Sequence, residues 1–208
     1  MVKATNLTDI DRNRIAEAVR GAETQTSVEI CLVLAKSSSQ YQAFEIIYPA
    51  LLALAAGGAA AVFHPALAAI SVFAVQGAVF VVGALILQWR PLRIALVPPK
   101  IKRQAAWRRA RLSYAGLGLQ NVRTKNAVLV FCSAAERYVE ILTDDAVVTA
   151  VPQETWTGIT DRFAKQFAKG DKTDAFVQAA AACAETLAVK FPPDPGRANQ
   201  LPDQLTEI

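Results

Sequence analysis

The chain has 208 residues, of which 53% are hydrophobic and 19% charged, and its formal net charge is +4. This composition excludes an intrinsically disordered chain, because such a chain lacks the apolar side chains that a folded core must bury. Three cysteines are too few for a disulfide scaffold, and ten glycines with ten prolines exclude a collagen-like or low-complexity chain. A pI near 9.1 points, by itself, to nucleic acid or anionic lipid as a partner.

The first predicted element is a helix that Thr8 caps and that ends near residues 21–24, since its apolar residues recur at helical spacing. A polar turn follows. Residues 28–35 then form a predicted strand whose apolar character is nearly continuous, as in strands that are covered on both faces. The serines at 37–39 form a predicted loop, and residues 41–45 begin the next helix.

A long uncharged stretch follows, because residues 46–89 are 44 successive positions without a charged side chain. A membrane-crossing helix needs about 20 apolar residues, so this stretch is long enough for two. A histidine and a proline at 64–65 divide it into spans at 46–63 and 66–89. The alternative is a buried helical hairpin of a soluble protein, but such a hairpin rarely stays free of charge over this length. We therefore predict a transmembrane helical hairpin over residues 46–90.

The flanks of this hairpin predict its orientation. Eight basic residues and no acidic ones lie between positions 90 and 111. Because Lys and Arg stay on the cytoplasmic side, we expect a multi-pass protein of the bacterial cytoplasmic (inner) membrane, with both termini in the cytoplasm and His64 on the far side. Aromatic residues at the two feet match an interfacial belt. The residues expected to face lipid or the membrane surface are Tyr48, Trp89, Arg90, Arg93, Lys100, Lys102 and Arg103.

Small residues recur along both predicted spans. They let helices approach closely, either within the hairpin or against another membrane protein. The positions expected to pack in this way are Ala53, Gly57, Ala61, Ala74 and Ala78. The spans contain no Asp, Glu, Lys or Arg, so an ion or proton path through this hairpin alone is not expected. The hairpin is therefore expected to be an anchor or a docking surface.

The rest of the chain predicts an α/β domain. Prolines at 91 and 98–99 indicate a connector along the membrane surface. The elements predicted after it are a helix at 100–117, strands at 127–133 and 137–142 joined by a short turn, a helix from Asp144 that Pro152 interrupts, helices at 154–169 and 171–190, and an extended tail at 192–208. Because a helical crossover separates the first two strands, we expect them to be parallel.

The predicted fold class is therefore α/β, with a small mixed β-sheet flanked by helices as an α/β/α sandwich. Residues 1–45 and 91–191 form one discontinuous cytoplasmic domain, and the membrane hairpin is inserted into it. We expect the two ends of the hairpin to lie close together, because the domain closes around them.

The residues offer few candidates for chemistry. Cys31, Cys132 and Cys183 are spaced too far apart for a metal motif, and we expect them to be buried core residues with free thiols. Among the acidic residues, Asp144, Asp145 and Glu136 could together hold a hard divalent cation such as calcium or magnesium. The competing interpretation is that Asp144 caps a helix and Glu136 is a solvated turn residue, and it is the one we favour.

The basic run between positions 90 and 111 has two interpretations. Trp107 and Tyr114 alternate with arginines there, a pattern found on nucleic-acid-binding surfaces. However, the run directly follows a predicted membrane span, where each basic residue gains about 1 kcal/mol from anionic headgroups. Membrane topology and lipid contact explain it fully, so anionic lipid is the expected partner and nucleic acid is not.

Three segments resemble a known family. They are Thr26–Ile30, Ala127–Ile141 with Asp144, and Asn199–Asp203, and the most specific part lies around Glu136-Arg137. The chain resembles the TPM-domain family in its bacterial membrane-protein branch, in which a hairpin is inserted after the first strand. The resemblance implies an α/β/α sandwich. It also implies functions seen among relatives: repair of a photosynthetic membrane complex, receptor modulation, and cation-dependent acid phosphatase activity.

The leading hypothesis from the sequence is a non-catalytic, membrane-anchored accessory, assembly or stability subunit of a larger inner-membrane protein complex, which it contacts through the hairpin. Two alternatives remain. One is a divalent-cation-dependent, phosphatase-like hydrolase that uses Asp144 and Asp145. The other is a module that binds anionic lipid surfaces through its basic run.

Overall fold

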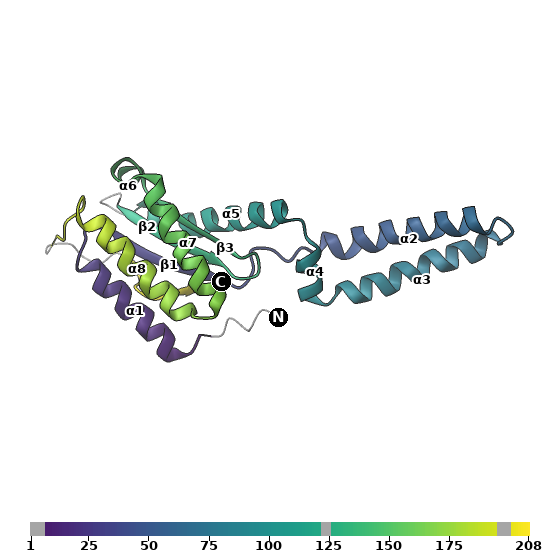
Figure 1. Cartoon of the computed structure of the whole chain (residues 1–208), viewed down its shortest axis with the longest axis horizontal. Coiled ribbons are helices and arrows are strands. Elements are labelled where there is room, and N and C mark those ends of the chain that lie inside the picture. Colours follow the sequence, from purple (N-terminus) through teal and green to yellow (C-terminus); the bar gives the residue numbers. More distant parts are fainter. Residues whose placement is uncertain (1–6, 122–125, 195–200) are drawn as a thin grey trace. The chain divides into compact units, whose positions relative to one another are not determined.

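The computed structural model describes residues 7–121, 126–194 and 201–208 (Figure 1). The chain divides into two compact units: Ser39–Lys102, here called the hairpin unit, and Val2–Ser38 with Arg103–Ile208, here called the sheet unit. In chain order the elements are α1 (Asp9–Glu23), β1 (Glu29–Ala35), α2 (Ala43–Phe63), α3 (Ala69–Leu87), α4 (Arg90–Leu96), α5 (Pro99–Gly116), the 3-10 turn η1 (Leu119–Asn121), β2 (Ala127–Ser133), β3 (Tyr138–Thr143), α6 (Asp145–Ala150), α7 (Gln153–Lys169), α8 (Lys172–Ala188) and β4 (Thr206–Glu207).

The sheet unit is built on four strands in the order β3-β2-β1-β4. β1 and β2 pair in parallel along their whole length, from Glu29 opposite Ala127 to Ala35 opposite Ser133. β2 and β3 are antiparallel and are joined by a tight turn at 134–137. The predicted mixed sheet is confirmed, and so is the parallel pairing expected from the helical crossover.

Helices cover both faces of this sheet (Figure 1). Successive side chains of a strand point to opposite faces, so Ile30 and Leu32 of β1 pack in one core cluster with residues of α1, α7 and α8. Cys31 and Val33 belong to a second cluster that includes Ala110 of α5. Every residue of β1 and β2 is consequently buried. The unit is the α/β/α sandwich that the sequence predicts.

The end of the chain adds a strand that the sequence does not predict. The extended tail expected at 192–208 instead ends in β4, which pairs in parallel with β1. The backbone nitrogen of Ile208 donates to the Leu34 oxygen at 3.0 Å, and Lys36 nitrogen donates to the Ile208 oxygen at 2.9 Å. Residues 195–200 of the predicted tail lie outside the described residues.

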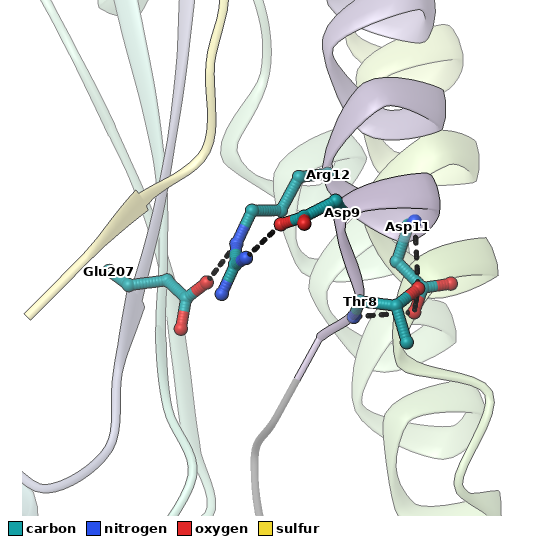
Figure 2. Close-up of polar contacts among 5 residues, drawn as sticks. All are labelled: Thr8, Asp9, Asp11, Arg12 and Glu207. Carbon is teal, nitrogen blue, oxygen red and sulfur yellow. Dashed lines mark hydrogen bonds and ion pairs between the residues drawn. The ribbon is translucent and has the colours of Figure 1, made fainter.

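Side chains also tie β4 and the start of α1 into the sheet unit. Arg12 Nε of α1 donates to Glu207 Oε1 of β4 at 2.8 Å (Figure 2). Thr8 caps α1 as predicted, because its Oγ1 accepts from Asp11 nitrogen at 3.2 Å while Asp11 Oδ2 accepts from Thr8 nitrogen at 2.9 Å (Figure 2). The Thr8 hydroxyl also donates to Asp11 Oδ2 at 2.7 Å, and this hydrogen bond, followed by the one from Thr8 nitrogen, lowers the pKa of Asp11.

The hairpin unit consists of α2 and α3, packed along each other, and the short helix α4. α2 ends at Phe63 with His64 as its C-cap, where the sequence predicts the break. The connector predicted from the prolines is instead largely helical, since α4 occupies Arg90–Leu96. Pro91 stands in its first turn, where the fixed φ of proline favours a helix start and its missing N–H is not needed.

Candidate functional site

The outer surface of the hairpin unit is the most unusual feature of the chain. α2 has 21 residues and α3 has 19, and both are long and apolar enough to cross a membrane. Only 17% and 6% of their most apolar windows are buried, unlike the mostly buried core helix of a soluble protein. Large apolar side chains stand outward, with Leu54 65% and Phe73 68% exposed. Soluble monomers rarely expose contiguous apolar surface of this kind.

One small-residue stripe of α2 forms the contact between the two helices. Pro49, Ala53 and Gly57 are the buried residues of α2, at four-residue spacing on one face. Gln76 of α3 lies directly on Gly57: a β-carbon built there would stand 2.1 Å from Gln76 Nε2. Gly83 meets Pro49 in the same way, with 3.2 Å between its ideal β-carbon and the Pro49 Cβ. Ala53 and Gly57, two of the predicted packing positions, lie on this buried face.

The other predicted packing positions point away from the partner helix. Ala61, Ala74 and Ala78 are all exposed. Gly77 stands beside two of them on α3, and a β-carbon there would meet nothing within 4 Å. Ala74, Gly77 and Ala78 therefore form a second small-residue face on α3, which does not take part in the contact with α2. The sequence could not separate the two faces, because Gly and Ala occur on both.

The feet of the hairpin hold the predicted interfacial residues. Tyr48 donates its hydroxyl to the Leu96 oxygen at 3.0 Å, and Trp89 is 67% exposed. Arg93 differs from the expectation, because it forms an ion pair with Glu45 in the first turn of α2 and its side chain is only 11% exposed. It joins α4 to α2 rather than facing lipid.

The other basic residues of this region are largely without acidic partners. Among the ion pairs of the described residues, only Arg93 and Arg111 of the basic run take part. Arg111 contacts both oxygens of Glu140 at 3.2 Å and stacks on Trp107 at 3.8 Å from the ring centroid. The positions predicted to face lipid are otherwise exposed or half-buried: Arg90, Lys100, Lys102 and Arg103.

Glu136, the first of the predicted cation ligands, is buried among hydroxyl groups. Its carboxylate accepts hydrogen bonds from Ser37 Oγ and Ser38 nitrogen, each at 3.1 Å, and from the Ser133 hydroxyl. The Ser38 and Ser133 hydroxyls are themselves 2.7 Å apart. We call these four residues the serine cluster. It lies at the carboxyl ends of β1 and β2, and it secures the loop by which the chain leaves the sheet unit.

Asp144, the second of the predicted cation ligands, links α5 to the β2–β3 hairpin. It accepts a hydrogen bond from the Tyr114 hydroxyl on Oδ1 and from Ala127 nitrogen at 3.2 Å on Oδ2. Burial, and then this hydrogen bond, raises the pKa of Tyr114. Asp144 is the N-cap residue of α6, as predicted, but its side chain makes no capping hydrogen bond to that helix and contacts Tyr114 and Ala127 instead.

The structure does not bring the three predicted carboxylates together. Asp144 lies beside Ala127 at the start of β2, whereas Glu136 lies just past Ser133 at its end. The six steps from Ala127 to Ser133, at about 3.3 Å each, separate the two by about 20 Å. Asp145 is exposed at the start of α6. In the part of the chain that the structure describes, no group of three or more His, Cys, Asp or Glu side chains could hold a metal ion.

Comparison with known proteins agrees with this architecture. Residues 92–186 match the family model of the TPM domain. This stretch of the chain is similar to the TPM domain. A search of curated proteins finds no match. Among solved structures, the BA42 protein of the psychrophilic bacterium Bizionia argentinensis is similar in fold, with a TM-score of 0.63 and 18% identity over 100% of both chains. The match begins in α4, although β1 lies within the sheet, so the sheet includes residues that precede the matched stretch.

Sequence reasoning missed several contributors to these sites. Gln76 is the only amide side chain within α3, and its polarity inside an apolar helix is the signal that could have marked it. The serine cluster joins residues nearly 100 positions apart, at a loop that shows only a run of serines. The sequence contained no signal that pairs Tyr114 with Asp144, because the two residues are 30 positions apart.

Proposed function

We propose that this protein is an accessory, assembly or stability subunit of a larger complex in the bacterial inner membrane. The hairpin unit anchors it and contacts the partner, and the α/β domain remains in the cytoplasm. The observation that carries this proposal is the outward apolar surface of α2 and α3. The apolar surface of these helices is almost entirely exposed, which is unfavourable in water. Contact with lipid or with another protein would cover it.

The charge distribution supports the proposed orientation. The basic residues follow α3 directly, and the tip between α2 and α3 carries no Lys or Arg. Positive residues stay on the cytoplasmic side of a membrane, so both long ends of the chain are proposed to be cytoplasmic. Anionic headgroups would then attract the exposed Arg90 and Lys100, each with about 1 kcal/mol.

A subunit role, rather than anchoring alone, is supported by the unused face of α3. Ala74, Gly77 and Ala78 point away from α2 and lack large side chains. Small residues allow the backbones of two membrane helices to approach closely. Because lipid is as apolar as the helices, this close packing, rather than a hydrophobic driving force, holds such helices together. The hairpin closes with Gly57 and Ala53, so this second face remains for another membrane protein.

The phosphatase-like alternative receives less support from the geometry. It requires acidic residues that converge on one phosphate site, but Glu136 and Asp144 lie at opposite ends of β2. Asp144 also already accepts hydrogen bonds on both carboxylate oxygens, from Tyr114 and Ala127.

The test is the mass of the complex extracted from native membranes with a mild detergent. We expect wild-type protein to migrate in native electrophoresis well above the 22.3 kDa of one chain. Gly77→Leu should release the free chain, because leucine would fill the unused face of α3. Val82→Leu, on an exposed residue that is already large, is the matched control and should leave the complex intact. Migration of the wild type as one chain under all mild conditions would refute the subunit role.

A further inference from the structure

A cavity of about 260 Å³ lies on the α5 side of the sheet unit, beside the β1–β4 edge. Its lining is mostly apolar, with Val33 of β1 and Leu112 and Leu117 from α5 and the turn after it. Leu112 is 61% exposed and so presents an apolar rim to solvent. Specific small-molecule sites combine such apolar walls with a few placed polar groups.

Arg109 is the one charged side chain among the residues that line this cavity. Its Nε is buried and has no hydrogen-bond partner among the described residues, and it takes part in none of their ion pairs. A buried donor without an acceptor is unfavourable, and nearly all such groups in folded proteins are satisfied. A small rotation of the guanidinium would present this donor to an acceptor in the cavity.

Two neighbouring polar residues, Glu207 and Ser113, are already engaged elsewhere. Successive side chains of a strand point to opposite faces, so Thr206 of β4 lines the cavity while Glu207 turns to Arg12 of α1 (Figure 2). The Ser113 hydroxyl donates to the Arg109 backbone oxygen at 2.9 Å. The cavity therefore offers one unopposed side-chain positive charge at an apolar wall.

We propose that this cavity binds a small carboxylate with an apolar tail, and that Arg109 holds its carboxylate. The planar guanidinium fork matches a carboxylate in two-point contact. A single lining cation balances one negative charge, which favours a carboxylate over a doubly charged phosphate ester. A 150 Å³ apolar cavity accommodates the six carbons of benzene, so 260 Å³ holds about ten heavy atoms. A six-carbon alkanoate fits within this limit. The site is independent of the proposed membrane role.

The test is calorimetric titration of the full-length protein in lipid nanodiscs with hexanoate, with empty nanodiscs as the blank. Saturable binding is expected for the wild type and at least tenfold weaker binding for Arg109→Gln. Arg108→Gln removes the same charge from the adjacent, exposed residue and should change the affinity less than twofold. Acetate, which lacks the tail, and hexanol, which lacks the charge, should both bind at least tenfold more weakly than hexanoate.

Arg109→Lys provides a second variant in case the glutamine variant does not fold. It keeps the charge but lacks the two-point fork, so we expect hexanoate to bind several-fold more weakly than to the wild type. The proposal is overturned if the wild type shows no saturable hexanoate binding, if Arg109→Gln or Arg109→Lys binds as tightly as the wild type, or if acetate binds as tightly as hexanoate.

Discussion

Replacement of Gly57 by alanine should loosen the contact between α2 and α3, whereas the same replacement one residue later should not. A β-carbon at Gly57 would lie 2.1 Å from Gln76 Nε2, 2.4 Å from its Cδ and 2.5 Å from its Cγ. Separations below 3 Å force the glutamine side chain or the helix to move. At Gly58 the added carbon meets nothing within 4 Å. The two substitutions thus differ only in this contact.

The expected magnitude follows from two opposing effects. Alanine gains about 0.5–1 kcal/mol over glycine in a helix, and this gain is common to both variants. Overpacking costs about 1–3 kcal/mol, and only Gly57→Ala incurs it. All three close atoms belong to the flexible Gln76 side chain, which can turn partly aside, so Gly57→Ala should be less stable than Gly58→Ala by about 1 kcal/mol, the low end of that range. Adding Gln76→Ala to Gly57→Ala removes the obstructing side chain and should restore most of that difference.

The assay is unfolding of the full-length protein in mixed micelles by titration with sodium dodecyl sulfate. Energy transfer between dyes on Gln42→Cys and Gln88→Cys, both exposed positions outside the two apolar helices, reports separation of α2 from α3. The midpoint should fall for Gly57→Ala alone. Equal midpoints for the two alanine variants, or no recovery in the double variant, would refute the proposed contact between Gln76 and Gly57.

Four further outcomes follow from the sheet unit. Tyr114→Phe removes a hydrogen bond to a carboxylate and should lower the free energy of unfolding by about 1.5–3 kcal/mol, measured by denaturant titration. Asp144→Asn should leave any hydrolysis of p-nitrophenyl phosphate with magnesium unchanged, and a specific loss would revive the hydrolase hypothesis. Burial raises the pKa of Cys31 to about 12, and the other two thiols are also buried, so Ellman's reagent should label the native protein only slowly between pH 7 and 9 and rapidly after denaturation. Thr8→Ala should cost about 1 kcal/mol at pH 7. Because the folded pKa of Asp11 is lowered, its stabilisation is present above its unfolded pKa, near 4, and is lost as the pH falls through the folded value, so thermal unfolding should show a smaller deficit at pH 3 than at pH 7.

Much of the fold could be predicted because its signals are local. The uncharged stretch predicted α2 and α3, and the continuous apolar runs predicted β1 and β2. β4 was missed because two residues provide no periodic pattern, and its place beside β1 comes from long-range backbone pairing, with Thr206 opposite Val33. The prolines suggested a connector where α4 forms, because Pro91 stands in the first turn, where proline is compatible with a helix.

The candidate site was less predictable, because residue type does not reveal which face a side chain takes. Ala74 and Ala53 both belong to small-residue patterns, but only Ala53 meets the partner helix. Glu136 and Asp144 were grouped because carboxylates suit a hard cation, but they stand on the two sides of β3. An extended strand of six residues holds them at its opposite ends.

The orientation of the hairpin tests the central claim most directly. His64→Cys at the tip and Gln153→Cys at the start of α7 can each be probed in intact spheroplasts with a membrane-impermeant maleimide, since the native cysteines are buried. We predict that His64→Cys is labelled in intact spheroplasts and Gln153→Cys only after the membrane is permeabilised. Labelling of both positions, or of Gln153→Cys alone, in intact spheroplasts would contradict a hairpin that crosses the membrane and returns to a cytoplasmic α/β domain.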